Sequence, residues 1–303
     1  MWLETYFEEK EILYLVIDRT KWAGINLLML SIVWEKRAIP IHFELLKQKG
    51  NSNFHQQTEA LTEILAIVQR YKICVLGDRE FCSIKLASWL QQQGVSFCLR
   101  LRKNEFIQQE SDIWLALKDL GLAPGLSLFL RGVKITKVSG FGHFNLACKW
   151  QRKLQGSAAT EGWFILTDLA ELQAAITAYK QRFDIEEMFR DFKTGGYNLE
   201  DTKVSGERLI TLILLIALAY TSATIQGQQI QRKGVQEYVG RVKEKSRTTR
   251  RHSSFYIGLY GYTWVSFMDN CQSLVTQLMR LHPNKRKYYQ QGQRAMRLVQ
   301  SVF

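Results

Sequence analysis

The chain has 303 residues, of which 46% are hydrophobic and 23% charged, a composition that is typical of a globular protein and argues against a disordered one. Its formal charge of +13 at pH 7 indicates a polyanionic partner, most simply nucleic acid, although an anionic membrane surface would favour the same excess. Five cysteines without CxxC spacing argue against a disulfide framework and a zinc knuckle, and no secretory signal is evident, so a cytoplasmic protein is expected.

The first hundred residues predict a mixed α/β fold. Apolar, β-branched runs alternate with segments of helical period. The predicted elements are strands at 11–18, 25–34 and 37–46, a helix at 56–70, a strand at 72–77, a helix at 82–93 and a strand at 95–101. This order, followed by a further helix, is ribonuclease-H-like, a topology in which the first and fourth strands are neighbours.

Two aspartates end predicted strands of this sheet. Asp18 closes the run from Glu11, and Asp78 closes the run from Tyr71. The carboxyl ends of strands in open α/β sheets are where ligands bind. Either residue alone could be an ordinary turn former. Because their strands are expected to be neighbours, the two carboxylates are predicted to lie side by side.

A second region, from about residue 101 to 168, predicts a β-rich insertion. After a short helix at about 110–120 the helical period is largely lost, and antiparallel hairpins follow, ending with a strand at 162–167. A long helix is then expected to open near Thr167 and Asp168, which would form its N-cap pair. The insertion would therefore interrupt a catalytic domain that covers residues 1–230.

The long helix carries an unusual stripe of polar side chains. At about 100° per residue, three of them lie within about 40° of the central Glu186: Tyr179, Arg182 and Lys193. A carboxylate flanked by two cations and a phenol suits a metal ion that is bound to a phosphodiester. A solvated face with Arg–Glu pairs would have the same pattern. Glu187, Asp184 and Asp191 lie off this stripe and are expected to be solvated.

Asp18, Asp78 and Glu186 together predict a cage of three carboxylates. Oxygen donors of this kind suit Mg²⁺ or Mn²⁺, and two ions are expected. Our hypothesis is that one ion activates a water or a 3′-hydroxyl, while the other stabilises the leaving oxygen of an in-line displacement. No Walker A motif, nucleophile elbow or Cys–His arrangement supports an ATPase or an acyl transferase.

These residues resemble the DDE triad and YREK signature of bacterial insertion-sequence transposases, most closely those of the insertion-sequence-four family. The resemblance rests on Asp18, on Asp78 with the Arg-Glu-Phe that follows it, and on the spacing Tyr-x2-Arg-x3-Glu-x6-Lys, and it extends from about residue 10 to 225. It implies metal-dependent cleavage of a DNA end and its transfer to new DNA by a cut-and-paste route. It further implies a bacterial, nucleoid-associated enzyme that forms a homodimer in the synaptic complex.

The resemblance also implies DNA contacts. Tyr179, Arg182 and Lys193 would contact the phosphates nearest the cleavage point. Trp163 is similar to the family tryptophan that stacks on a flipped base, although a core tryptophan at a strand start is the alternative. Arg190 is a further candidate contact on the same stripe, and a surface arginine is the simpler interpretation.

The C-terminal part of the chain carries most of the excess charge. Residues 231–303 contain 14 Lys and Arg against 3 Asp and Glu, which predicts a basic helical region that binds DNA. Its densest cluster comprises Lys243, Lys245, Arg247, Arg250 and Arg251. The apolar run at 209–225 is shorter than the roughly 20 residues of a spanning helix and contains several hydroxyl side chains, so a buried core helix is expected and no membrane role.

Related transposases begin with a helical DNA-binding region before the first aspartate, whereas Asp18 lies almost at the start of this chain. We therefore expect that region to be missing. Two alternatives to a transposase stay open on this basis. One is a truncated, catalytically silent DNA-binding fragment, and the other is a ribonuclease-H-like nuclease that cuts without strand transfer.

Overall fold

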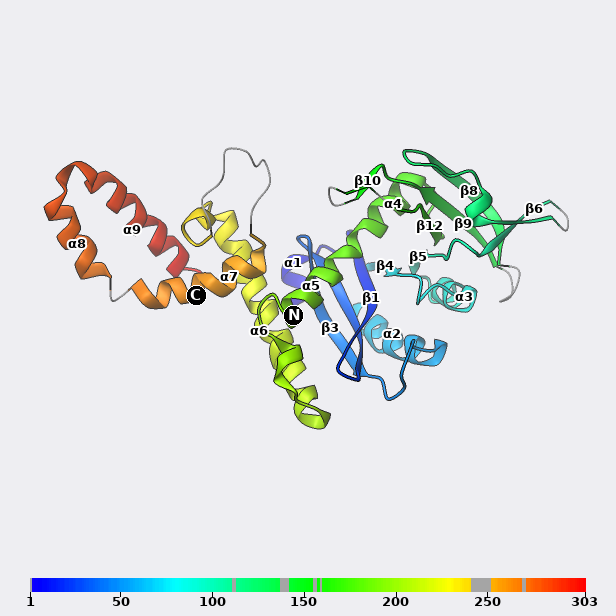
Figure 1. The fold of residues 1–303 in the computed structure, drawn as a ribbon, viewed down its shortest axis with the longest axis horizontal. Coiled ribbons are helices and arrows are strands. Elements are labelled where there is room, and N and C mark those ends of the chain that lie inside the picture. The colour runs from blue at the N-terminus through cyan, green and yellow to red at the C-terminus, as the bar shows by residue number, and fades with distance from the viewer. Residues whose placement is uncertain are drawn as a thin grey trace. The chain divides into compact units, whose positions relative to one another are not determined.

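The computed structural model forms two compact units, Met1–Asp191 and Phe192–Phe303 (Figure 1). It describes residues 2–110, 113–136, 142–154, 157–158, 160–240, 252–268 and 271–303. The predicted division of the chain at residue 230 differs from this boundary and stays a prediction.

The first unit is built on a ten-stranded sheet whose order is β3-β2-β1-β4-β5-β12-β9-β8-β6-β7. The strands are β1 (Ile12–Trp22), β2 (Ile25–Trp34), β3 (Arg37–Leu45), β4 (Lys72–Gly77), β5 (Ser96–Arg100), β6 (Phe106–Glu110), β7 (Ile113–Ala116), β8 (Ser127–Ile135), β9 (Gly142–Lys149) and β12 (Trp163–Thr167), with a separate two-stranded pair of β10 (Lys153–Leu154) and β11 (Ser157–Ala158). β1 is antiparallel to β2 and parallel to β4, and β4 is parallel to β5. This is the ribonuclease-H-like arrangement, so the predicted fold class is confirmed, including the β-rich insertion.

Helices cover both faces of the central strands. The helices of this unit are α1 (Trp2–Tyr6), α2 (Phe54–Val68), α3 (Ile84–Gln92), α4 (Leu172–Gln181) and α5 (Phe183–Lys193), whose last two residues belong to the second unit. Leu13, Leu15 and Ile17 alternate along β1 and join the core that contains the buried residues of α2 and α3. On the opposite face, Ser31 of β2 contacts Met188 of α5. Strands buried on both faces explain the nearly continuous apolar runs.

Two predictions about helices are wrong, one within the insertion and one directly after it. The segment predicted as a helix at about 110–120 contains strand β7 and a 3-10 turn (Leu117–Asp119), because Leu115 and Ala116 pair with β6. The helix expected near Thr167 begins at Leu172. Asp168 does not cap it: its carboxylate accepts the Phe97 N–H at 2.9 Å and so ties the end of β12 to β5.

The second unit is helical in its described residues. Its helices are α6 (Gly206–Arg232), α7 (Ser254–Met268), α8 (Gln272–Leu281) and α9 (Arg286–Gln300), with 3-10 turns at Leu199–Thr202, Gln236–Tyr238 and Pro283–Lys285. The expectation of a buried core helix at 209–225 holds for one face, because Ile213 and Tyr220 are buried while Leu215 and Leu218 are 58% and 62% exposed. Within the described ranges, α6 is the one helix long and apolar enough to cross a membrane, a property that core helices share.

Helices α6 and α7 approach each other at two glycines. A Cβ atom added to Gly227 would lie 1.7 Å from the Ser254 carbonyl oxygen, and one added to Gly258 would lie 1.7 Å from that of Ala223. Both obstacles are backbone atoms, which cannot rotate away. The close crossing therefore requires glycine at both positions.

We expect Gly227→Ala to lower the free energy of unfolding by about 3 kcal/mol, because the two helices must separate to admit the methyl group. Urea unfolding of the full chain, followed by circular dichroism, measures this. Gly292→Ala on α9 is the matched control, because no atom beyond its chain neighbours and its own helix backbone lies within 4 Å of the added Cβ. There alanine should stabilise the helix by about 0.5–1 kcal/mol. Equal stability of the two variants would contradict the close crossing.

Candidate active site

Asp18 and Asp78 lie next to each other at the carboxyl edge of β1 and β4. The last paired residues of these parallel strands are Ile17 and Gly77, so both acids follow directly. Asp18 Oδ1 accepts the Arg19 N–H at 2.7 Å, and Asp78 Oδ1 accepts the Glu80 N–H at 2.8 Å. The predicted neighbourhood of the two aspartates is thus present.

Arg182 connects Asp18 to Glu186. Its Nη1 lies 3.3 Å from Asp18 Oδ2, and its Nη2 donates to Glu186 Oε1. Its side chain is 6% exposed, and its guanidinium lies 4.7 Å from the centre of the Phe183 ring. In the described part of the chain, no three His, Cys, Asp or Glu residues lie close enough together to hold a metal ion. Asp18 thus lies beside Asp78 and is joined to Glu186 through a guanidinium, but the three acids are not gathered closely enough to form such a group.

The electrostatics of the site follow from burial and crowding of charge. Burial raises the pKa of Asp18 to about 7, and the charges of Asp78 and Glu186 add to this, while Arg182 and the Arg19 N–H oppose it. Burial disfavours the charge of Arg182, but Tyr179 and the two neighbouring carboxylates raise its pKa overall. Arg182 therefore stays cationic and partly neutralises the acids.

The donor set fits Mg²⁺ or Mn²⁺. Asp18, Asp78 and Glu186 offer only carboxylate oxygens, which these hard cations prefer to sulfur or imidazole nitrogen. Burial disfavours the charged form of Asp18, and a divalent cation bound there would favour it. Such a cation would compete with Arg182 for the oxygens of Asp18 and Glu186, because both carboxylates already bind the guanidinium.

The two aromatic residues predicted to contact DNA are buried. Tyr179 is 0% and Trp163 is 3% exposed, and their ring centres lie 5.2 Å apart. Trp163 also packs on Phe183 at 5.6 Å. Burial raises the pKa of the Tyr179 hydroxyl, while the cations of Arg182 and Arg100 oppose this shift. DNA could reach these rings only after local movement, so their DNA contacts stay predictions.

The other predicted DNA contacts are Lys193, Arg190 and the basic cluster near residue 250. Lys193 ends α5 within the second unit, and its Nζ lies 2.8 Å from Glu200 Oε1. Arg190 is a surface residue, 62% exposed, that pairs with Glu187. The cluster of Lys243, Lys245, Arg247, Arg250 and Arg251 falls outside the described residues.

The expectation that the off-stripe acids of α5 are solvated is wrong for Asp191, and Asp184 and Glu187 are only partly exposed. Asp191 is 7% exposed, and its Oδ2 lies 3.1 Å from Nη1 of Arg37 on β3. Burial raises the pKa of Asp184 and of Asp191 to about 6. Glu187 is half-buried. The physical reason is that α5 packs against β2 and β3, so a helix with one polar stripe has other faces that are covered.

Several charged residues around the acids were not found from sequence. Arg79 and Arg100 both bind the carboxylate of Glu161, Arg100 at 2.7 Å. Burial lowers the pKa of Arg100, with the cations of Arg79 and Arg182 adding to it. Arg19 pairs with Glu80. A signal was available, because an arginine directly follows each of the two aspartates.

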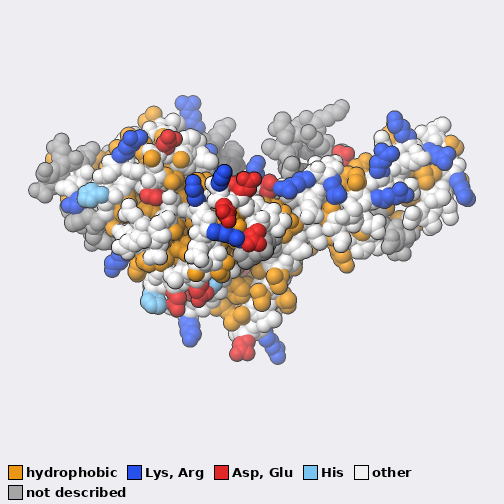
Figure 2. All heavy atoms as spheres, turned by 180° about the vertical axis from the view of Figure 1, so that it is seen from behind, with side chains coloured by type: hydrophobic (Ala, Val, Ile, Leu, Met, Phe, Trp, Pro, Cys, Tyr) orange, Lys and Arg blue, Asp and Glu red, His pale blue; other side chains and the backbone are white. Residues whose placement is uncertain are grey.

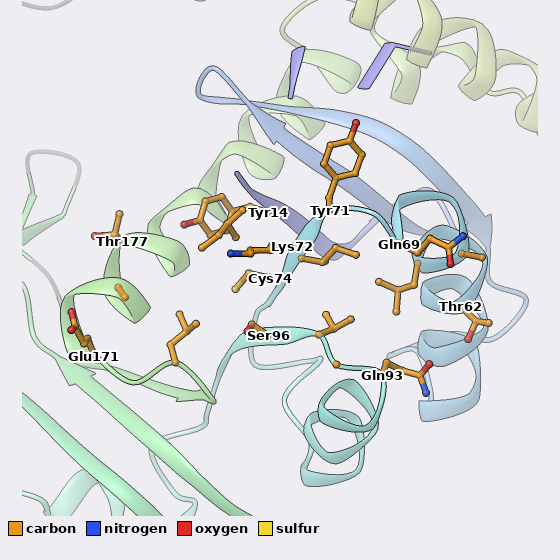
Figure 3. A pocket seen from close by; sticks show the side chains of 18 of the residues that line it. Tyr14, Thr62, Gln69, Tyr71, Lys72, Cys74, Gln93, Ser96, Glu171 and Thr177 are labelled. Carbon is orange, nitrogen blue, oxygen red and sulfur yellow. The ribbon is translucent and has the colours of Figure 1, made fainter. Parts of the chain in front are cut away.

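A cavity of about 930 Å³ lies at the opposite edge of the sheet, where β1, β4 and β5 begin (Figure 3). Its lining includes Tyr14, Lys72, Cys74 and Ser96, and one acid, Glu171. Asp18, Asp78 and Glu186 do not line it. The candidate site is therefore the open edge that carries the acids, and the cavity is separate from it.

Comparisons with known proteins bear on this site. A family model described as "Transposase DDE domain" matches residues 15–222, while no curated protein matches the chain. A solved structure of the piggyBac transposase synaptic complex with hairpin DNA is similar at 17% identity and a TM-score of 0.46, covering 85% of this chain and 53% of that one. An Argonaute from Marinitoga piezophila in complex with 5′ OH guide RNA and target DNA is similar at 9% identity and a TM-score of 0.27, covering 58% and 26%. The chain thus spans about half the length of the piggyBac transposase chain.

Proposed function

The chain belongs to the family of transposase DDE domains, and we propose on this basis that it cleaves the ends of a DNA element and transfers them to new DNA. The observation that supports the proposal is the position of Asp18 and Asp78 at one sheet edge, with Asp18 joined through Arg182 to Glu186 of α5. All three acids lie within the matched residues 15–222.

The spacing of the α4–α5 signature supports a finer assignment. Tyr179, Arg182, Glu186 and Lys193 keep the YREK spacing of the insertion-sequence-four family. We therefore propose an insertion-sequence transposase of this group that acts by a cut-and-paste route on bacterial nucleoid DNA. Two copies would bring two ends together in a homodimer.

The proposed chemistry assigns a role to each acid. Asp18, Asp78 and Glu186 would hold two Mg²⁺ or Mn²⁺ ions. Bound ions of this kind supply Lewis acidity for the attacking and leaving oxygens of an in-line displacement. Arg182, once released from the carboxylates, presents a forked guanidinium that binds a phosphate through two parallel hydrogen bonds.

A direct test of the function uses pre-cut DNA ends, the full chain and Mn²⁺, and measures the joining of the ends to a target duplex. Joined products are expected. Metal-dependent cleavage without joining would instead indicate a ribonuclease-H-like nuclease. Binding without cleavage in either Mg²⁺ or Mn²⁺ would indicate a catalytically silent DNA-binding fragment.

The C-terminal region is proposed to bind the DNA backbone. Residues 271–303 contain no Asp or Glu, and Figure 2 shows Lys and Arg side chains gathered over the C-terminal helices at its right-hand end. Contacts of this type release counterions, so the logarithm of the binding constant should fall steeply with the logarithm of salt concentration. The cluster from Lys243 to Arg251 is proposed as part of the same footprint.

Arg250→Gln combined with Arg251→Gln should reduce the slope of the logarithm of the binding constant against the logarithm of salt concentration by up to about 1.8, because each lost phosphate contact lowers this slope by about 0.9. Fluorescence anisotropy of a labelled duplex across a salt series measures the slope. The control neutralises Lys10 and Lys85, two exposed lysines of the first unit, and should leave the slope unchanged. An equal slope in both double variants would place the footprint elsewhere.

A further inference from the structure

Regular sheet pairing stops just before the two aspartates. The β1–β4 pairing ends at Ile17 and Gly77. Beyond this point β1 continues beside β2, where Asp18 is opposite Met29, whereas β4 ends. Hydrogen bonds of the sheet therefore fix the backbone of Asp18 but not that of Asp78. Another interaction must set the separation of these two like-charged groups.

Arg19 and Glu80 supply such an interaction. The Arg19 Nε donates to Glu80 Oε1 at 2.7 Å, and its Nη2 donates to Oε2 at 2.7 Å, which is the forked geometry of a strong pair. The two side chains are 11% and 13% exposed. The backbone N–H groups of the same two residues bind the carboxylates of Asp18 and Asp78, at 2.7 and 2.8 Å. Each member of the pair thus also holds the acid beside it.

The pair is anchored to the rest of the first unit. Arg19 Nη1 donates to Asn26 Oδ1 on β2 at 2.8 Å. Glu80 Oε1 accepts the Ser52 N–H at 3.0 Å and the Ser52 hydroxyl at 3.2 Å. Gln57, in the first turn of α2 and 4% exposed, donates to the same hydroxyl at 3.1 Å. The network therefore runs from β1 through the Asp78 turn to the start of α2.

We propose that Arg19 and Glu80 are positioning residues that hold Asp18 and Asp78 at the separation needed to share a divalent cation. The pair acts through the two aspartates, and its forked bond replaces the missing β1–β4 pairing. Two neighbouring carboxylates repel each other, and a rigid link opposes their separation. This inference rests on the proposed function, because it deepens the metal-dependent chemistry of the same site.

An ordinary buried ion pair would stabilise the fold without affecting the acids. Such a pair would lower the melting temperature when broken but would leave the dependence on metal concentration unchanged. Groups that orient metal ligands commonly change metal affinity by about 10- to 100-fold when they are lost. The metal dependence therefore distinguishes the two roles.

The test compares Arg19→Gln, Glu80→Gln and the double variant with wild-type full chain. Mn²⁺ alone is the probe. Two midpoints are measured: the Mn²⁺ concentration that gives half of the maximal rise in melting temperature without DNA, and the Mn²⁺ concentration that gives half-maximal cleavage. Both midpoints should rise by about 10-fold or more. The double variant should equal the single ones, because all three lose the same link. Duplex affinity, measured by anisotropy, should stay within twofold of wild type.

Two further variants serve as controls for a general loss of stability. Arg70→Gln breaks an exposed pair with Glu4 and should leave both Mn²⁺ midpoints unchanged. Arg19→Lys keeps the charge without the fork and should give an intermediate midpoint. Wild-type midpoints in Arg19→Gln and Glu80→Gln would overturn the positioning role.

Hydrogen exchange separates failure of this inference from failure of the proposed function. A wild-type chain that neither responds to Mn²⁺ nor cuts DNA would refute the metal-dependent function. The link is then judged by exchange of the Glu80 amide, which donates to Asp78 in the wild type. Faster exchange in Arg19→Gln supports the link, and unchanged exchange overturns it.

Discussion

Asp18→Asn, Asp78→Asn and Glu186→Gln are each expected to abolish Mg²⁺-dependent nicking of a DNA end by the full chain. Each substitution keeps the size of the side chain and removes one anionic oxygen donor, and a hard cation binds a neutral amide far less well. Loss of one electrostatic stabiliser at a reacting centre commonly costs about 10²- to 10³-fold in rate. A gel assay with a labelled end substrate measures the rate.

Asp184→Asn is the matched control for these three variants. Asp184 lies two residues before Glu186 on α5, is partly buried, and is off the predicted stripe. It should nick at close to the wild-type rate, with binding of the end substrate also unchanged. Any of the three acids whose variant still nicks normally, at a melting temperature close to wild type, is removed from the triad.

The core of the fold was predictable because its signals are local. The apolar runs that end at Asp18 and Asp78 are long, β-branched and bounded by polar residues, so they specify buried strands without reference to partners. The order of elements then restricts the topology, and the two acids fall at the same edge. The segment at 113–116 was different. Its apolar residues suit a helix or a strand, and pairing with β6 decides the outcome.

The details of the site depend on side-chain reach, which spacing does not specify. The predicted stripe requires one unbroken helix. In the structure a turn at Arg182 separates α4 from α5, and the Arg182 N–H donates to the carbonyl of Tyr179, three residues back. Tyr179 packs against Trp163, whereas the family resemblance implied a contact with DNA phosphates. The pairing of Arg182 with Glu186 follows directly from the i,i+4 geometry of a helix.

The role of Arg19 was not predictable for a similar reason. Its sequence position beside Asp18 gives no indication that its partner is Glu80, 61 residues away. The partner becomes apparent only when the parallel neighbours β1 and β4 are placed together. Pairs of charged residues that follow the aspartates of adjacent strands are therefore a pattern worth testing in related sequences.

Arg182→Gln is expected to have opposite effects on metal binding and on DNA cleavage. In the wild-type chain the guanidinium occupies oxygens of Asp18 and Glu186 that a divalent cation would also use. Removing it should lower the Mn²⁺ concentration needed to raise the melting temperature without DNA. Cleavage of the end substrate should nevertheless fall, because the forked phosphate contact is lost. Thermal unfolding across an Mn²⁺ series and the gel assay measure the two effects.

Stability provides a third readout for the same variant. Without metal, Arg182→Gln leaves the buried Asp18 without its cation, and breaking a buried pair in this way costs about 3 kcal/mol. Mn²⁺ should restore most of that loss by binding the folded state, so the thermal shift should exceed that of wild type. Arg190→Gln, which breaks an exposed pair on the same helix, is the control and should change none of the three measurements. If Arg182→Gln instead weakened Mn²⁺ binding, the guanidinium would be a support of the metal ligands and not a competitor for them.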